Sequence, residues 1–264
     1  DPNMVSNIHS AYFEAGATVA TTNSYTILRD RLKHFELEHE VQNLWNSSVA
    51  AACKARDRFG AGRVAGSIGP LIASYRPDIC PPVEEASSIY KEKVESIAPK
   101  VDILLVETVC SLKQAKGVLA ATDNSNKPVW ISFSVDDKDG TKLRSGENLE
   151  GVEAVINNHF VEAVLINCSP PEVVGNALSI LSKMGLAFGA YANGFSKISS
   201  DFLKTRPTVD ALTARKDLGP EEYSNFVTNW IRNGASIVGG CCEIGPTHIS
   251  KIAQKIHELG YKTL

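Results

Sequence analysis

Short apolar segments alternate with longer segments of helical spacing along the whole chain. Several of the short segments are apolar at nearly every position, as in Ile103-Leu104-Leu105-Val106, rather than at every second position. Continuous apolar runs of this length are typical of strands buried on both faces of a parallel sheet. The pattern therefore predicts parallel strands at residues 19–25, 63–69, 102–108, 128–135, 163–169, 186–193 and 236–242.

The segments between these runs place apolar side chains on one face of a helix. The spacing i, i+3, i+4, i+7 is found at Tyr223, Phe226, Val227 and Trp230, at Val174, Ala177, Leu178 and Leu181, and at Ile249, Ile252, Ala253 and Ile256. Prolines at 170, 171, 220 and 246 stand where these helices would begin, which is the helical position that tolerates proline best.

Seven strand–helix units in 264 residues favour an α/β fold of the (β/α)8 TIM-barrel type. The chain opens with a predicted helix at residues 4–15 that leads into the run at 19–25, so the first strand of the barrel is expected to be missing from this chain. The alternative is a doubly wound open sheet, but the first run is not followed by the Gly-x-Gly-x-x-Gly motif of that fold. With no repeats and no convincing linker, residues 1–264 are predicted to form one domain.

Composition narrows the function classes. A net charge of −3, with 27 basic and 30 acidic residues and no basic block, argues against a nucleic-acid partner. No apolar run is long enough for a membrane span and no leader peptide is recognisable, so we expect a cytoplasmic protein whose cysteines are thiols or metal ligands. The sequence does not indicate an oligomeric state.

Three of the six cysteines fall at predicted strand ends. Cys168 ends the run at 163–169, whereas Cys241 and Cys242 end the run at 236–242 after two glycines. The carboxyl ends of the strands form the active-site face of an α/β barrel. Neighbouring residues of a strand point to opposite faces, so Cys241 and Cys242 can converge only where the strand ends, and Gly239 and Gly240 are expected to supply that freedom. Three thiolates with a fourth position open suit a catalytic zinc ion.

Other readings of the cysteines remain open at this point. Cysteine is commonly a buried apolar residue, which is the interpretation for Cys53, Cys80 and Cys110 because each stands alone. A redox disulfide between Cys241 and Cys242 is an alternative to a metal site, although adjacent cysteines form a disulfide only with strain.

The motif Gly239-Gly-Cys-Cys-Glu-Ile-Gly-Pro-Thr-His248, together with Asn167-Cys168, resembles the zinc-binding signature of the homocysteine S-methyltransferases. The segments Ala20-Thr-Thr-Asn-Ser-Tyr25, Gly66-Ser-Ile-Gly-Pro70, Leu104-Leu-Val-Glu-Thr108 and Tyr191-Ala-Asn-Gly194 also resemble that family, in the same order along nearly the whole chain.

The resemblance implies a barrel in which Cys168, Cys241 and Cys242 bind zinc and the sulfur of homocysteine becomes the fourth ligand. It implies that the carboxylate of Glu107 binds the amino group of homocysteine. Further substrate-binding candidates are Thr22, Asn23, Tyr25, Asn167 and Asn193. His248 lies within the motif but on the following predicted helix, so we expect a role at the helix start or on the surface rather than metal ligation.

The expected reaction is transfer of a methyl group from a sulfonium donor, S-methylmethionine or S-adenosylmethionine, to homocysteine, which yields methionine. A sulfonium donor is favoured because betaine enzymes carry a C-terminal extension and folate enzymes carry further domains. The alternatives are betaine as the donor, another thiol or a selenol as the acceptor, and a catalytically silent zinc-binding barrel. Family members begin with a strand that carries an Asp/Gly-Gly motif, which this sequence lacks.

Overall fold

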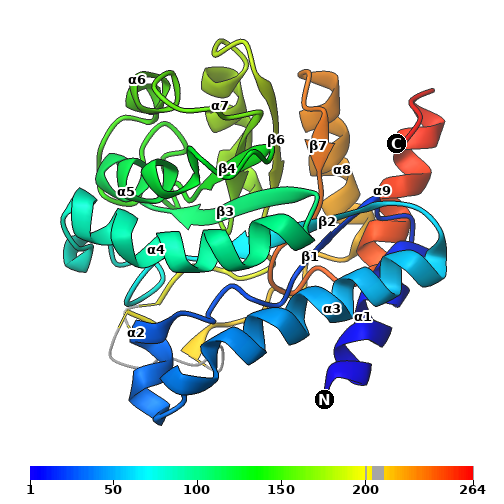
Figure 1. The fold of residues 1–264 in the computed structure, drawn as a ribbon. Coiled ribbons are helices and arrows are strands. Elements are labelled where there is room, and N and C mark those ends of the chain that lie inside the picture. The colour runs from blue at the N-terminus through cyan, green and yellow to red at the C-terminus, as the bar shows by residue number, and fades with distance from the viewer. Residues whose placement is uncertain (200, 204–210, 264) are drawn as a thin grey trace.

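The described part of the chain, residues 1–199, 201–203 and 211–263, alternates strands and helices in a computed structural model (Figure 1). All seven predicted strands are present, and most are shorter than the apolar run that predicted them. They are β1 (Val19–Thr21), β2 (Arg63–Ile68), β3 (Ile103–Val109), β4 (Val129–Phe133), β5 (Ala163–Asn167), β6 (Ala187–Tyr191) and β7 (Ile237–Val238).

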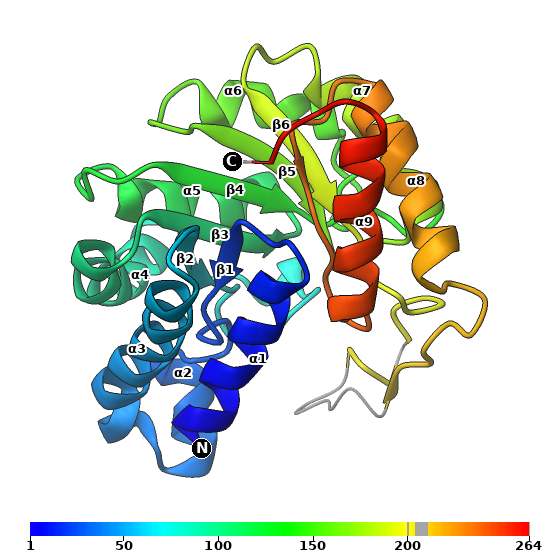
Figure 2. The same ribbon diagram turned by 90° about the vertical axis from the view of Figure 1, so that its right-hand side faces the viewer.

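The strands form one parallel sheet in which spatial order equals chain order, β1-β2-β3-β4-β5-β6-β7. A doubly wound sheet would reverse its strand order at a switch point, so that alternative is wrong. The sheet curls, and the helices that follow the strands lie along its outer side (Figure 2). The α/β fold of a curled parallel sheet agrees with the predicted barrel class.

The helices begin where the sequence places prolines or capping residues. Pro171, Pro220 and Pro246 are first residues of their helices, as predicted, and the side chain of Ser111 accepts a hydrogen bond from the backbone of Gln114 at the start of α5. The α-helices are α1 (Pro2–Glu14), α2 (Arg29–Leu32), α3 (Val41–Phe59), α4 (Val83–Ile97), α5 (Leu112–Thr122), α6 (Val152–Ile156), α7 (Pro171–Leu181), α8 (Pro220–Arg232) and α9 (Pro246–Glu258). Single 3-10 turns lie at Lys33–Phe35, Glu38–Glu40, Pro77–Ile79, Ala98–Lys100 and Leu149–Gly151.

Alternate residues of each strand enter two different apolar clusters. On β3, Leu104 and Val106 pack in the large cluster that includes the helices, whereas Ile103 and Leu105 pack in a smaller cluster with residues of the other strands. The smaller cluster fills the inside of the curved sheet. This alternation decides which side chains at the strand ends face the interior.

The two edges of the sheet remain separate among the described residues. There, β1 pairs only with β2 and β7 pairs only with β6, so the seven strands curl without closing into a ring. Helices α1 and α9 meet beside this gap, where a Cβ added at Gly16 would lie 2.8 Å from that of Ala253. None of the described helices has the length and apolarity needed to cross a lipid bilayer.

Pairing of β7 with β6 depends on a glycine. A Cβ added at Gly189 of β6 would lie 1.7 Å from the carbonyl oxygen of Ile237 on β7. We expect Gly189→Ala to lower the free energy of unfolding by about 2 kcal/mol or more, because the backbone must shift to relieve the contact. Urea denaturation measures the change.

Gly175→Ala in α7 is the matched control. Nothing lies within 4 Å of a Cβ at Gly175, so alanine there is expected to leave the protein equally stable or about 0.5 kcal/mol more stable. An equal urea midpoint for Gly189→Ala and the parent protein would show that the β6–β7 contact is not as close as described.

Candidate metal and substrate site at the strand ends

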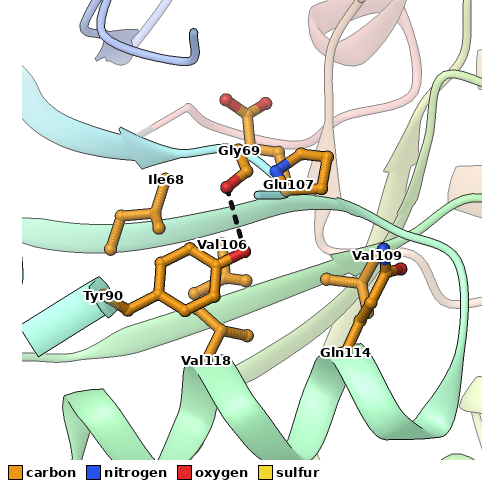
Figure 3. Close-up of a pocket in the computed structure, with 9 residues that line it drawn as sticks. Ile68, Gly69, Tyr90, Val106, Glu107, Val109, Gln114 and Val118 are labelled. Carbon is orange, nitrogen blue, oxygen red and sulfur yellow. Dashed lines mark hydrogen bonds between the residues drawn. The ribbon is translucent and has the colours of Figure 1, made fainter. Parts of the chain in front are cut away.

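Glu107 lies near the carboxyl end of β3 and faces the inside of the curved sheet. It continues the alternation of Ile103 and Leu105, and only 8% of its surface is exposed. Figure 3 shows its carboxylate pointing away from Tyr90, which lies on the helix side of the sheet.

Two side chains from other strands hold the Glu107 carboxylate. The Ser67 hydroxyl on β2 donates to Oε1, and the Tyr191 hydroxyl on β6 donates to Oε2 at 3.1 Å. Burial raises the pKa of Glu107 to about 7, since removal from water disfavours the charged form, and the hydrogen bonds oppose that shift. The carboxyl group is therefore poised between its two protonation states near neutral pH.

The segment after β1 is tied to β2 beside this carboxylate. The Ser24 hydroxyl donates to the Ser67 carbonyl at 2.8 Å and the Ser67 amide donates to the Thr22 hydroxyl at 3.0 Å. Lys93, fully buried on α4, donates from Nζ to the Ser24 carbonyl at 2.6 Å. Burial lowers the pKa of Lys93 to about 7, and the charge of Glu107 acts in the opposite direction. Thr22 therefore helps to position Ser67, which holds Glu107.

Asn167 ends β5 and is fully buried. Its Oδ1 accepts hydrogen bonds from the Thr108 amide at 3.0 Å and the Ser132 hydroxyl at 2.9 Å, and its Nδ2 donates to the Thr108 hydroxyl at 2.9 Å. These bonds fix Thr108, whose backbone is left-handed with φ 58°. The amide thus joins the ends of β3, β4 and β5 and positions the residue next to Glu107.

Cys168 follows β5 and leaves the strand by a left-handed turn with φ 49°. In a regular strand it would continue the alternation of Val164 and Ile166, which face the helices. The turn instead brings Cys168 into a buried cluster with Tyr75 and Cys110, against which Cys241 packs.

Cys241 and Cys242 were predicted to end a strand at 236–242, but β7 ends at Val238, so both lie in the segment beyond it. The segment that follows β6 holds them in place. The Cys241 amide donates to the Ala192 carbonyl at 2.9 Å, and the Gly194 amide donates to the Cys242 carbonyl at 2.9 Å. The predicted source of the turn was wrong in one respect. Neither Gly239 nor Gly240 has a positive φ, so neither adopts a conformation that requires glycine. A Cβ at Gly240 would lie 2.0 Å from the side chain of Ile244, so glycine at this position leaves room for Ile244.

The three sulfurs converge. The Sγ atoms of Cys168, Cys241 and Cys242 all lie within 4.8 Å of one another, and those of Cys241 and Cys242 are 3.9 Å apart. Hydrogen bonds with Cys168 and Cys241 lower the pKa of Cys242, whereas hydrogen bonds with Cys168 and Cys242 raise the pKa of Cys241. Three thiols this close cannot all ionise unless a cation compensates their charge. The group can hold a soft divalent metal.

The remaining predicted site residues differ in burial and in hydrogen bonding. Tyr25 is hydrogen-bonded to Ser74 at 2.8 Å, and burial together with the charge of Cys168 raises its pKa. Asn193 is buried and accepts a hydrogen bond from the Phe195 amide, whereas Asn23 is exposed. His248 accepts a hydrogen bond from the Gly245 amide at the start of α9, the helix-start role that its position predicts.

The site contains residues that the sequence patterns did not single out. Ser67 and Tyr191 lie at or near strand ends, so the strand-end argument that pointed to the three cysteines could have found both. Lys93 lies at helical spacing with Tyr90, Val94 and Ile97 on the buried face of α4, and a lysine on an apolar face is a signal in itself. Arg144 lies in the connection after β4 and carried no such signal.

Two cavities lie near the strand ends. The one in Figure 3, between β3 and the helices, has a volume of about 10 Å³, which suffices for a water molecule but not for an amino acid. The second has a volume of about 330 Å³ and adjoins the turn after Cys168. Asp137, Pro170, Glu172, Ser196, Arg215 and Asp217 line it.

Comparison with known proteins agrees with this arrangement. The homocysteine S-methyltransferase family model matches residues 1–256. Homocysteine S-methyltransferase 1 of Brassica oleracea var. italica is 28% identical over 97% of this chain and 84% of its own length, and the selenocysteine Se-methyltransferase of the same plant is 25% identical over 97% and 80%. The crystal structure of the metallated homocysteine methyltransferase MmuM from Escherichia coli superimposes with a TM-score of 0.81 at 25% identity, covering 97% of this chain and 85% of that one.

The matched region includes the strand-end carboxylate and all three converging cysteines. Because the family model covers nearly the whole chain, the protein belongs to the homocysteine S-methyltransferase family.

Proposed function

We propose that the protein is a zinc-dependent methyltransferase that transfers a methyl group from a sulfonium donor to the thiol of homocysteine and so forms methionine. The observation that carries the proposal is the convergence of Cys168, Cys241 and Cys242 at the carboxyl ends of β5 and β7. Membership of the homocysteine S-methyltransferase family supports both the reaction and the acceptor.

The sulfur geometry suits zinc as the metal. Zinc–sulfur bonds of about 2.3 Å in a tetrahedral site place neighbouring sulfurs roughly 3.8 Å apart. The distance of 3.9 Å between Cys241 and Cys242 agrees with that value, and small side-chain rotations would bring Cys168 to it. The metallated state of the Escherichia coli relative adds independent support for a metal.

A zinc ion held by these three cysteines would supply a Lewis acid that stabilises a substrate thiolate at neutral pH. The chain supplies the remaining functions. Glu107, with Ser67 and Tyr191 to orient it, would bind the ammonium group of homocysteine. Thr22 and Asn167 would position the ends of β2 and β3, and Tyr25, Asn193 and the exposed Asn23 would border the substrate.

The proposed role of Glu107 predicts a pH dependence. Its pKa is raised to about 7, so the carboxylate that pairs with ammonium is lost as pH falls below about 7. The quantity to measure is the ratio of two kcat/KM values, that for homocysteine over that for the analogue without the amino group. We expect this ratio to fall up to about tenfold per pH unit below pH 7. The ratio cancels the ionisation of the thiol, which both substrates share. A ratio that does not vary between pH 5.5 and 8.5 would contradict the assignment.

The larger cavity supports a cationic methyl donor. Three carboxylates, Asp137, Glu172 and Asp217, line it together with Arg215. Arg215 pairs with Glu172 and Asp217, and Asp137 pairs with Arg144, so the carboxylates exceed the guanidiniums by one charge. Its volume of about 330 Å³ lies in the range of small-molecule sites. S-methylmethionine and S-adenosylmethionine are both sulfonium cations. Betaine is also cationic at its nitrogen and is the third donor to be compared.

The experiment that tests the function is a donor panel on zinc-loaded protein. S-methylmethionine, S-adenosylmethionine and betaine are each supplied with homocysteine, and methionine is quantified by mass spectrometry. We expect methionine with at least one sulfonium donor and none after the metal is removed by a chelator. Methionine formation at an unchanged rate in metal-free protein would refute the zinc mechanism, and no product with any donor would favour a catalytically silent barrel.

A selenol acceptor is the second candidate. The Brassica relative named selenocysteine Se-methyltransferase, 25% identical over 97% of this chain, favours its inclusion. Selenocysteine in place of homocysteine in the same panel distinguishes the two acceptors by their kcat/KM values.

The finer architecture belongs to the same proposal. Residues 1–264 would form a single homocysteine-binding domain, and the curl of the sheet would be that of an eight-stranded barrel in which a first strand fills the gap between β1 and β7. A cytoplasmic location would keep the three cysteines reduced, as metal binding requires.

A further inference from the structure

Cys168 adopts a conformation that the residue itself disfavours. A cysteine at φ 49° brings its Cβ close to its own backbone, so surrounding contacts must stabilise the turn. The turn is also the reason that the sulfur leaves the helix side of β5 and meets Cys241. Whatever holds the turn therefore controls the geometry of the three sulfurs.

The carbonyl group of Cys168 is held by two donors. The Ser134 hydroxyl donates to it at 3.1 Å and Arg144 Nη2 donates at 3.2 Å. Arg144 also donates from Nε to the Ser134 hydroxyl oxygen at 2.7 Å. That bond leaves the hydroxyl proton free to point at the carbonyl, so one guanidinium provides the direct contact and orients the second donor.

Arg144 is itself fixed in place. Its Nη2 lies 2.6 Å from Asp137 Oδ1, its guanidinium lies 4.8 Å from the centre of the Tyr75 ring, and only 11% of its side chain is exposed. The other carboxylate oxygen of Asp137 accepts a hydrogen bond from the Ile198 amide. A planar group held by a carboxylate and an aromatic ring loses little freedom when it binds the carbonyl.

We propose that Arg144 is a positioning residue for the metal site: it holds the Cys168 peptide in its left-handed turn and so sets the affinity of the three cysteines for zinc. The inference rests on the proposed zinc function and goes beyond it, because Arg144 contacts the Cys168 backbone carbonyl and would act on the metal through that ligand. Outer groups that orient metal ligands typically contribute 10–100-fold to metal affinity.

Zinc affinity measured by competition with a chromophoric chelator tests the inference. Arg144→Met keeps the aliphatic stem but removes the Nη2 donor to the Cys168 carbonyl and the Nε donor that orients Ser134. We therefore expect zinc to bind about 10–100-fold more weakly than in the parent protein. Arg144→Lys restores the charge without the two-pronged geometry and is expected to recover only part of the loss. Ser134→Ala removes one donor and should have the smaller effect.

Arg56→Met is the matched control. Arg56 is also partly buried and paired with a carboxylate, that of Asp102 at 3.1 Å. It lies near the end of α3, before β2, and Asp102 lies directly before β3, so the pair is at the opposite end of the strands. The zinc affinity of the Arg56→Met variant is expected to stay within about twofold of the parent value. Cobalt-substituted protein gives a second readout, because the visible absorption of bound cobalt reports ligand geometry and should shift in Arg144→Met.

The outcomes separate this inference from the proposed function. A parent protein that binds no zinc refutes the metal site itself. A parent protein that binds zinc, with a folded Arg144→Met variant equal to it in zinc affinity and cobalt spectrum, overturns the positioning role alone, whether or not the urea midpoint changes. If Arg144→Met does not fold, Arg144→Lys and Ser134→Ala decide, and equal affinities in both overturn the inference.

Discussion

Replacing Cys241 by serine is expected to remove zinc from the protein and to lower methyl transfer by on the order of 1,000-fold, equivalent to about 4 kcal/mol of transition-state stabilisation. Serine nearly matches the size of cysteine but offers a hard oxygen that stays protonated, whereas zinc prefers the soft thiolate. We expect Cys168→Ser to cause the same losses, because the sulfurs of Cys168 and Cys241 both belong to the group whose members lie within 4.8 Å of one another. Metal content by atomic emission and methionine formation measure the two losses.

Cys53→Ser is the control for this experiment. Cys53 lies on α3, and its sulfur is 3.7 Å from the Lys100 carbonyl, outside the group of three. It is expected to keep about one zinc per chain and the parent activity. Full zinc content in Cys241→Ser, with activity intact, would show that the convergence of sulfurs has another purpose.

The second large effect is expected at Glu107. Glu107→Gln keeps the shape of the side chain and one acceptor oxygen, so only one of the Ser67 and Tyr191 hydroxyls can still donate to it. The substitution also removes the negative charge that would pair with the homocysteine ammonium in a buried site. We expect KM for homocysteine to rise about 100-fold, since loss of a buried charge partner costs about 2–5 kcal/mol. Zinc content should not change, which separates substrate binding from metal binding.

The analogue of homocysteine without its amino group makes the Glu107 test specific. The parent enzyme should use this analogue poorly, and Glu107→Gln should use it as well as the parent does, because neither protein forms the ammonium contact with it. Equal losses on homocysteine and on the analogue would mean that Glu107 supports the site as a whole rather than binding the amino group.

The sequence predicted the strands and the cysteine group for one physical reason. The carboxyl ends of parallel strands meet at one edge of the sheet, so Cys168 and the pair after β7 had to lie near one another once the apolar runs were recognised as parallel strands. The inward orientation of Glu107 could be predicted by the same reasoning combined with the two-residue alternation of β3.

The local backbone geometry was not predictable in this way. The left-handed Cys168 is contacted by other segments, and Arg144 provides one of these contacts from a connection without periodicity. The predicted strand at 236–242 shrank to the two residues of β7, because apolar runs do not reveal where pairing stops. The role of Gly240 depends on the position of Ile244, which only the fold determines.

The brevity of β7 has a mechanical consequence. Two residues pair it with β6, and among the described residues its other edge has no strand partner. The cysteines that follow β5 and β7 reach across β6, so an ion bound by all three would fasten the last strand to the interior of the sheet. Metal release would then be coupled to loosening of the unit formed by α8, β7 and α9. The ion would stabilise the position of this unit in addition to its role in the reaction.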